Sequence, residues 1–168
     1  IRNEIGYLVC KKPFPSMTKS FVGDDERYLE TYFSRWPEVW YHGDFVKIDE
    51  DGYWFIYGRS DDVIKVAGRR IGPGEIEESF LKHLSVKEAA AIGAPDEIKG
   101  ERLVCFVVLK DDSGVSENEL KEHCGNLLGK TLVPDKIYII SALPKTRSGK
   151  IPRGLIRQVF LGKEIKDT

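Results

Sequence analysis

The sequence predicts an α+β fold, in which a shorter β-rich part precedes a small domain with a three-stranded sheet, flanking helices and a β-hairpin. In the second part, apolar residues recur with helical spacing in three segments, and short runs rich in Val and Ile separate them. Charge also changes along the chain. Residues 23–51 hold nine acidic and three basic side chains, whereas residues 144–168 hold two acidic and seven basic. We therefore expect two parts with different roles, residues 1–60 and 61–168.

The first part is rich in aromatic and turn residues. An Asp51-Gly52 pair lies between two apolar runs, which is a strong signal for a β-hairpin because such a pair suits the tight turn. The elements expected here are a strand over residues 6–10, a helix over residues 26–33, and hairpin strands over residues 45–48 and 53–58.

The second part predicts the order β-α-β-β-α-β-α. Ser116 with Glu119 three residues later forms a capping-box pattern, which marks the start of a helix. The expected strands cover residues 63–66, 86–93, 101–109 and 136–140, and the helices cover residues 74–84, a segment from Ser116 and a segment from Pro152. Their apolar faces are predicted to be Ile76, Phe80 and Leu84, then Leu120, Cys124, Leu127 and Leu128, and finally Leu155, Ile156, Val159 and Phe160.

Composition excludes several classes of protein. A chain of 168 residues with a net charge of −1 suits one domain, or one domain with a piece of another, and does not suit binding of nucleic acid through a basic surface. No apolar run approaches the roughly 20 residues that span a bilayer. The three cysteines show no CxxC spacing, so neither a disulfide framework nor a zinc site is expected, and a reducing cytoplasm is the default. The first residues resemble neither a start nor a signal peptide, and we expect them to be mid-protein sequence.

Two stretches near the middle of the chain could bind a nucleotide. Gly43-Asp44 lets a ligand approach the backbone, and the Asp44 carboxylate can accept both hydroxyls of a ribose; the alternative is an ordinary turn. Arg59 could hold phosphate or ribose oxygens. Asp61 lies between the two parts, where a pivot of the chain would have to be. The alternative for Arg59 and Asp61 is a solvated salt bridge.

Two further stretches carry basic side chains on loops. Gly68 to Gly74 places glycines, Arg69 and Arg70 before a helix, which suits an anion site or the rim of a site for a long phosphate-bearing ligand, or else is a plain β-α connection. Lys150 follows Ser148-Gly149 on a flexible basic loop and can deliver a positive charge to a phosphate or carboxylate oxygen. A solvated loop and a nucleic-acid-binding tail are the alternatives.

Taken together and in this order, these stretches resemble the C-terminal portion of AMP-forming acyl-CoA synthetases, in the adenylate-forming superfamily. Residues 41–44 resemble the family's Tyr-x-Thr-Gly-Asp segment without its Thr, residues 49–76 its hinge motif, and residues 144–150 its Pro-x4-Gly-Lys motif. Residues 23–33 are similar to acetyl-CoA synthetase and its short-chain relatives.

The resemblance implies a ligase that forms an acid–thiol (carbon–sulfur) bond in two steps, from a short-chain carboxylate, ATP and CoA, with Mg²⁺ accompanying the ATP. It implies that Asp44 and Arg59 bind the nucleotide, that Asp61 is the hinge, and that Lys150 is catalytic. Gly68 and Arg70 would then bind CoA. No metal ligand is implied here. Lys150 would also be a target for a lysine acetyltransferase and deacetylase, since acetylation would cancel its charge.

On the same resemblance, residues 1–60 are the β-rich end of a large adenylating domain, and residues 61–168 are a mobile C-terminal domain. The family's Ser/Thr/Gly-rich phosphate loop is missing from this sequence, so the chain alone is expected to be inactive. Two alternatives stay open: a freestanding, non-enzymatic module that binds CoA, an adenylate or a partner, and a basic-tail nucleic-acid binder. Neither a nucleic acid nor a membrane is expected as a partner.

Overall fold

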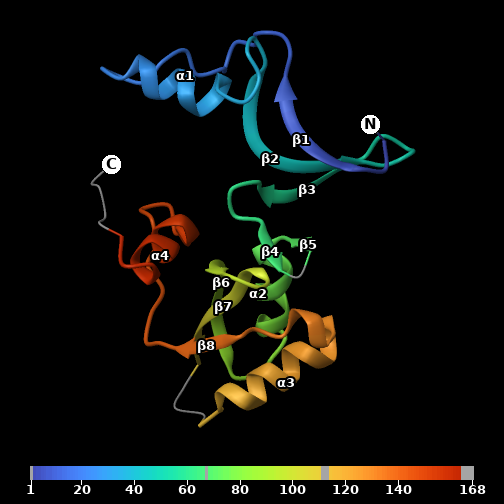
Figure 1. Cartoon of the computed structure of the whole chain (residues 1–168), viewed down its shortest axis with the longest axis vertical. Coiled ribbons are helices and arrows are strands. Elements are labelled where there is room, and N and C mark those ends of the chain that lie inside the picture. The colour runs from blue at the N-terminus through green and yellow to red at the C-terminus, as the bar shows by residue number, and fades with distance from the viewer. Residues whose placement is uncertain (1, 67, 111–113, 164–168) are drawn as a thin grey trace. The chain divides into compact units, whose positions relative to one another are not determined.

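The computed structural model describes residues 2–66, 68–110 and 114–163. The chain divides into two compact units, Ile1–Asp61 (unit 1) and Asp62–Thr168 (unit 2). The predicted α+β class is confirmed, because both units combine helices with sheets (Figure 1).

Unit 1 contains a three-stranded antiparallel sheet with the order β1-β2-β3 and one helix. The predicted hairpin is confirmed, and its turn is closed by the Tyr53 amide, which donates to the Asp49 carboxylate at 2.8 Å. The second strand begins earlier than the sequence pattern indicates, so it includes Gly43 and Asp44. The elements are β1 (Ile5–Cys10), α1 (Asp25–Phe33), β2 (Trp40–Ile48) and β3 (Trp54–Arg59).

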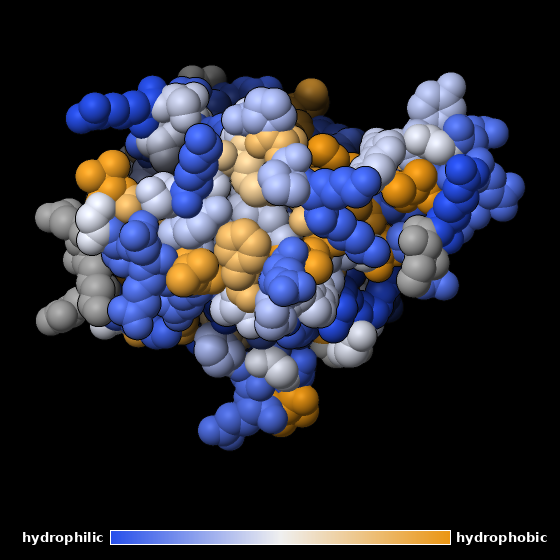
Figure 2. All heavy atoms as spheres, turned by 90° about the horizontal axis from the view of Figure 1, so that it is seen from above, coloured by the Kyte–Doolittle hydropathy of each residue, from blue (hydrophilic) through white to orange (hydrophobic). Residues whose placement is uncertain are grey.

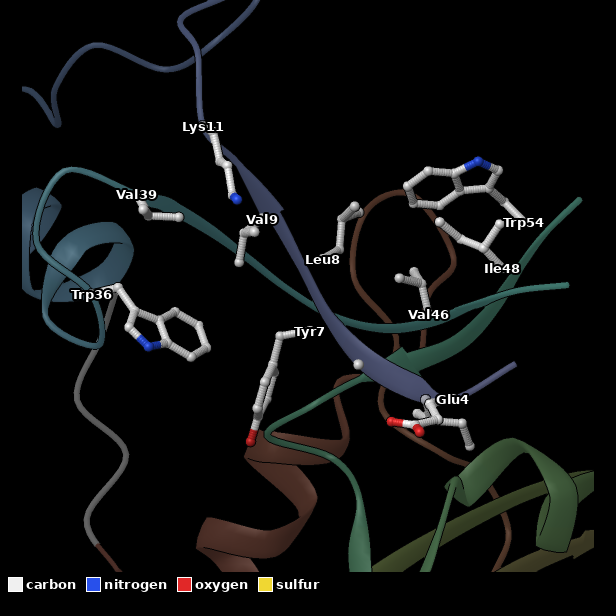
Figure 3. A pocket seen from close by; sticks show the side chains of 12 residues that line it. Glu4, Tyr7, Leu8, Val9, Lys11, Trp36, Val39, Val46, Ile48 and Trp54 are labelled. Atoms are coloured by element: carbon white, nitrogen blue, oxygen red, sulfur yellow. The ribbon is translucent and has the colours of Figure 1, made fainter. Parts of the chain in front are cut away.

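Much of the apolar surface of unit 1 stays exposed. Five consecutive side chains at β3, Tyr53 to Tyr57, are between 45% and 70% exposed. A cavity of about 530 Å³ lies among side chains of β1, β2 and β3 together with Trp36 and Val39 (Figure 3). Apolar side chains stand among hydrophilic ones on the face seen in Figure 2. None of the predicted site residues lines this cavity.

Unit 2 is built on a five-stranded sheet, not on a sheet of three strands. The predicted three strands are present as β6 (Val86–Asp96), β7 (Gly100–Leu109) and β8 (Lys136–Ile139), with β8 parallel to β7. The antiparallel hairpin of β4 (Ile64–Val66) and β5 (Arg69–Ile71) joins the sheet through pairing of Val66 with Gly100. Residues 69–71, predicted as loop, are therefore a strand.

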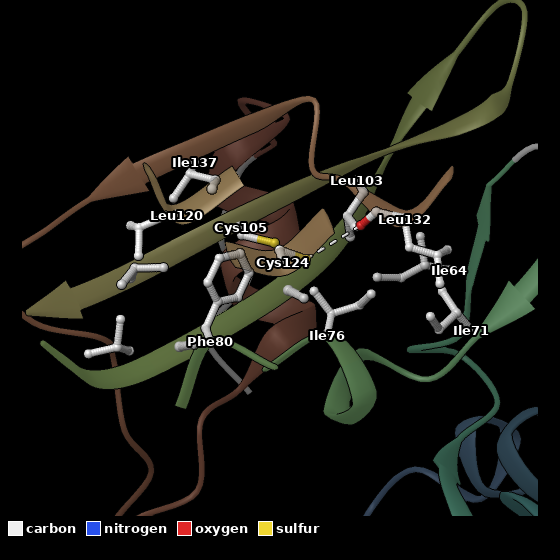
Figure 4. Close-up of a cluster of buried hydrophobic side chains, with 14 of the residues drawn as sticks. Ile64, Ile71, Ile76, Phe80, Leu103, Cys105, Leu120, Cys124, Leu132 and Ile137 are labelled. Carbon is white, nitrogen blue, oxygen red and sulfur yellow. Dashed lines mark hydrogen bonds between the residues drawn. The ribbon is translucent and has the colours of Figure 1, made fainter. Parts of the chain in front are cut away.

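Helices cover both faces of this sheet, because side chains of β6 and β7 alternate between two apolar clusters. One cluster contains Ala89, Ala91, Leu103, Cys105 and Val107 with side chains of α2 (Pro73–Leu81) and α3 (Glu117–Leu128) (Figure 4). The other contains Ala90, Ile92, Ala94, Val104 and Val108 with Ile156 of α4 (Arg153–Phe160). The short helix η1 (Lys130–Leu132) follows α3. Cys105 is fully buried, and its burial raises the pKa of the thiol well above the ordinary value.

Three residues predicted to lie on inner helix faces are exposed. Leu84 is 87% exposed because α2 ends at Leu81, so Leu84 no longer continues the face that carries Ile76 and Phe80. Leu127 and Val159 lie at the edges of their apolar faces and are about half exposed. The predicted capping at Ser116 is confirmed, since its side chain accepts a hydrogen bond from the Glu119 amide at 3.2 Å.

Glu117 ties α3 to β8 through its carboxylate. Lys136 Nζ lies 2.6 Å and Lys121 Nζ 3.0 Å from its oxygens, and the Ile137 amide donates to it at 3.2 Å. The hydrogen bonds from these groups, Lys136 first, lower the pKa of Glu117 from 4.5 to about 2. Because the folded state lowers this pKa, the contribution to stability is complete above pH 4.5 and is lost as pH falls toward 2.

We expect Glu117→Gln to lower the urea midpoint of the chain near neutral pH, and the gap from wild type to close as pH falls from 4.5 toward 2. Far-UV circular dichroism at a series of pH values measures this. Glu122→Gln, on the exposed face of the same helix, is the control and should leave the midpoint unchanged. A gap that stays constant with pH would contradict the assigned role.

Candidate functional site

Asp44 and Arg59 face each other across the β2–β3 hairpin. They are paired in the strand register, and Arg59 Nη1 lies 3.9 Å from Asp44 Oδ1. His42 Nδ1 lies 2.8 Å from the other carboxylate oxygen of Asp44. The Asp44 side chain is only 16% exposed, whereas that of Arg59 is 51% exposed. The carboxylate thus lies between His42 and Arg59, although His42 Nδ1 forms no hydrogen bond with the described residues, and the guanidinium can still reach a ligand.

Gly43 lets the Arg59 guanidinium lie directly against the backbone of β2. Its φ is +93°, and a Cβ atom there would come within 2.6 Å of the guanidinium nitrogens. Arg59 Nη1 donates to the His42 carbonyl at 3.0 Å. Only glycine fits this position without displacing Arg59, because the backbone conformation and the space both exclude a side chain.

Hydrogen bonds hold the residues that follow β3 close to Gly43 and Arg59. The Ser60 amide and its hydroxyl both donate to the Gly43 carbonyl, at 2.8 and 3.0 Å, and the Ser60 hydroxyl contacts the Tyr41 hydroxyl. Arg59 Nε donates to Asp61 Oδ1 at 3.2 Å. The structure therefore brings Asp44, Arg59 and Asp61 together, and unit 1 ends at Asp61.

The predicted CoA residues lie on the β4–β5 hairpin of unit 2. Gly68 is in the turn, with φ of +79° and no atom within 4 Å of a Cβ built there. Arg70 lies on β5, where it pairs with Lys65 in the register, and its side chain is exposed. Gly68 thus presents bare backbone that a ligand can approach closely.

Lys150 closes a small loop that precedes α4. Its amide donates to Thr146 Oγ1 at 3.1 Å, its carbonyl accepts from the Thr146 amide at 2.9 Å, and Gly149 has φ of +83°. Lys150 is exposed, and among the residues that the structure describes no carboxylate forms an ion pair with it. No described hydrogen bond or ion pair joins it to Gly68 or Arg70, so the structure does not bring these three together.

Sequence reasoning missed the ion pair that anchors α4. The Arg153 guanidinium donates two hydrogen bonds to the buried Glu77 carboxylate, at 2.7 and 2.6 Å. Hydrogen bonding to Glu77 raises the pKa of Arg153. The one signal in the sequence was an acidic residue between Ile76 and Phe80 of an apolar helix face.

No metal centre is built from the described side chains. Groups of three or more His, Cys, Asp or Glu residues placed to hold a metal ion are not found in residues 2–66, 68–110 and 114–163. We assign the described residues no part in binding Mg²⁺. In the same described ranges, no helix is long and apolar enough to cross a membrane.

Comparison with known proteins identifies the class to which this fold and these residues belong. Residues 75–150 match the model of the AMP-binding enzyme C-terminal domain, and this match ends at Lys150. The ATP-bound MatB structure from Rhodopseudomonas palustris superimposes with a TM-score of 0.79 at 27% identity, over 95% of this chain and 31% of that one.

Curated relatives narrow the class. An acetyl-coenzyme A synthetase from Pyrobaculum arsenaticum is 48% identical over 165 residues, which is 96% of this chain and 25% of that protein. A 3-hydroxypropionyl-coenzyme A synthetase from Sulfurisphaera tokodaii is 45% identical over 172 residues, 98% of this chain and 26% of that protein. The chain thus spans about a quarter of the length of these relatives. It belongs to the AMP-forming acyl-CoA synthetase family and corresponds to the C-terminal portion of such an enzyme.

We expect Gly43→Ala to destabilise unit 1 by about 2 kcal/mol, because it adds a clash with Arg59 to the strain of a positive φ. Gly52→Ala is the matched control, since φ there is +92° and nothing lies within 4 Å. Urea unfolding followed by tryptophan fluorescence measures both, because all three tryptophans (Trp36, Trp40 and Trp54) lie in unit 1. Equal losses in the two variants would contradict a cost of the clash and show that the guanidinium, the far end of a half-exposed side chain, moves aside freely.

Proposed function

We propose that this chain is the C-terminal portion of an AMP-forming acetyl-CoA synthetase or a related short-chain acyl-CoA ligase. The observation that carries the proposal is the similarity to acetyl-coenzyme A synthetase along nearly the whole chain, at 48% identity. One relative of comparable identity acts on 3-hydroxypropionate by its name, so the proposal specifies a short-chain carboxylate and not one acid.

The proposed reaction has two steps. A carboxylate oxygen attacks the α-phosphorus of ATP, and the bond from this phosphorus to the oxygen that bridges to the β-phosphorus breaks. Pyrophosphate departs, and an acyl-adenylate is formed. The sulfur of CoA then attacks the acyl carbon and loses its proton, the carbon–oxygen bond to the phosphate breaks, and AMP leaves. Negative charge gathers around the α-phosphate in the first step, whereas the second step requires access for a long thiol arm.

Asp44 and Arg59 bind the nucleotide in this proposal. The Asp44 carboxylate accepts the two ribose hydroxyls, and Arg59 donates to ribose and phosphate oxygens. The support is geometric. His42 and Arg59 lie on either side of Asp44, Gly43 leaves room for the Arg59 guanidinium against β2, and half of the Arg59 side chain is open to a ligand. ATP and AMP thereby bind to unit 1 through one acceptor and one cationic donor.

Lys150 stabilises the first step, and Gly68 and Arg70 serve the second. Lys150 offers an exposed ammonium group that bridges the carboxylate and α-phosphate oxygens. Gly68 lets the pantetheine arm of CoA pass close to the backbone, and the exposed Arg70 pairs with its phosphates. Because these residues serve different steps, unit 2 presents them in turn by rotating about Asp61, the last residue of unit 1.

The proposal includes regulation by acetylation, which the difference between two lysines of one loop supports. Lys145 is paired with Glu88 at 2.7 Å, whereas Lys150 is exposed and has no carboxylate partner among the described residues. In our proposal a lysine acetyltransferase therefore modifies Lys150, which removes the charge that adenylation needs, and a deacetylase restores it. The enzyme is proposed to act in the cytoplasm, where ATP and CoA are available.

In the full-length enzyme, we expect Lys150→Ala to lower the rate of acyl-adenylate formation by about 10²- to 10³-fold and to spare thioester formation from supplied acyl-adenylate. The first half-reaction is measured by carboxylate-dependent pyrophosphate exchange. Lys145→Ala, on the same loop, is the control and should retain both half-reactions. Equal loss of both half-reactions in Lys150→Ala would contradict its role.

A bulky residue at Gly68 should have the reverse effect. It should slow thioester formation from supplied acyl-adenylate and spare acyl-adenylate formation.

The chain by itself is expected to bind CoA and AMP weakly and to form no acyl-adenylate, because it holds only part of each site. Isothermal titration of the 168-residue chain with each ligand measures this. Tight binding of either ligand would instead favour a freestanding binding module, and salt-dependent retention on DNA or RNA would favour a nucleic-acid binder.

A further inference from the structure

An ion pair in unit 2 that joins the buried carboxylate of Glu77 to the partly exposed guanidinium of Arg153 has no part in the roles proposed so far. Glu77 belongs to α2 and its side chain is 9% exposed, whereas the side chain of Arg153, the first residue of α4, is 28% exposed. Arg153 Nε lies 2.7 Å from Glu77 Oε1, and Nη2 lies 2.6 Å from Oε2. The Ala91 amide of β6 also donates to Oε1, at 3.0 Å. Two parallel hydrogen bonds fix the plane of the guanidinium, so they orient the first turn of α4.

The same guanidinium reaches the start of unit 2. Arg153 Nη1 lies 3.6 Å from Oδ2 of Asp62, the residue that directly follows Asp61. One side chain therefore connects the first residue of the unit, helix α2 and the start of α4. Lys150 lies three residues before this junction.

The loop that carries Lys150 is anchored less firmly at its other end. Lys145 pairs with Glu88 at 2.7 Å, but the Lys145 side chain is 46% exposed, and an exposed pair of this kind contributes little. The hydrogen bonds between Thr146 and Lys150 close the loop without attaching it to the rest of the unit. Leu143 before the loop and Ile151 directly after Lys150 pack in the apolar cluster that contains Ile156, and the pair of Glu77 and Arg153 adds the directional contact that orients the loop.

We propose that Glu77, acting through Arg153, is a positioning residue for Lys150. It holds the start of α4 against α2 and beside Asp62, so that the Lys150 loop moves with the hinge end of unit 2 as one rigid body. This inference rests on the proposed function, since it gives the Lys150 loop a fixed place during a rotation about Asp61.

The test is Glu77→Gln in the full-length enzyme, with Glu101→Gln as the matched control. Gln has nearly the shape of Glu but loses the charge and one of the two acceptor oxygens for Arg153. Glu101 also holds α4, through Arg157 at 2.8 Å, but touches neither Arg153 nor Asp62 in the described contacts. Each variant thus weakens one anchor of the same helix.

We expect Glu77→Gln to lower kcat for acyl-adenylate formation about tenfold or more, because a small displacement of a catalytic group has a large effect on rate. Thioester formation from supplied acyl-adenylate should stay near the wild-type rate, and Glu101→Gln should retain both half-reactions. A merely structural role would affect both half-reactions alike. If Glu77→Gln slows both equally, or if Glu101→Gln slows adenylation as much, the positioning role is wrong.

A second readout does not depend on activity. In the 168-residue chain, hydrogen exchange at the amides of residues 146–153 should be faster in Glu77→Gln and unchanged in Glu101→Gln. If Glu77→Gln fails to fold by circular dichroism, Arg153→Lys takes its place, because it keeps the charge and removes the two-pronged contact. Unchanged exchange would overturn the proposal. A wild-type enzyme without adenylation would instead refute the proposed function.

Discussion

The pairing of β6 with β7 is the constraint on which the rest of unit 2 depends. The ladder runs from Val86 and Leu109 to Asp96 and Gly100, and both of its faces are buried. One face binds α2 and α3, and the other binds α4. Because each strand side chain must serve one of two cores, a shift of the register by one residue would exchange the two faces and detach both sets of helices.

Charged side chains add contacts of defined direction to this apolar framework, and these contacts orient α4. Apolar packing places α4 through Ile156, which is 7% exposed, and through Phe160, whose ring contacts those of Phe106 and Tyr138. Arg153 and Arg157 supply the directional contacts, to Glu77 and to Glu101 with the Gly93 carbonyl. Such a pair contributes modestly to net stability, but removing the cation leaves the buried carboxylate of Glu77 without its partner, so the pair favours a single arrangement.

The sequence predicted the features that local chemistry determines. Asp51-Gly52 marked the hairpin, Ser116 marked the start of a helix, and residues 101–109 were predicted as a strand; the structure confirms all three. The candidate residues on the hairpin, Asp44 and Arg59, were chosen from local patterns; their roles stay predictions, and the structure adds that they face each other.

Features that depend on contacts distant in sequence were missed. The strand β5 begins with Arg69-Arg70, which looks like a loop until pairing with β4 supplies its hydrogen bonds. Leu84 fits the helical period, but the helix ends before it. Glu77 and Arg153 are 76 positions apart, so no local pattern relates them. Residues 69–71 and Glu77 each depend on a partner on another element, and Leu84 depends on where the backbone leaves the helix.

The sheet of unit 1 has a consequence for how the chain behaves in solution. Its order β1-β2-β3 leaves an outer edge on β1 and on β3 that no other described strand covers, and the side chains beside the β3 edge are exposed aromatics and Ile56. Open edges with apolar side chains template the addition of further strands. A net charge of −1 provides almost no electrostatic repulsion between copies. The colloidal behaviour of the separate chain is therefore governed by this edge and by protein concentration, more than by the well-packed core of unit 2.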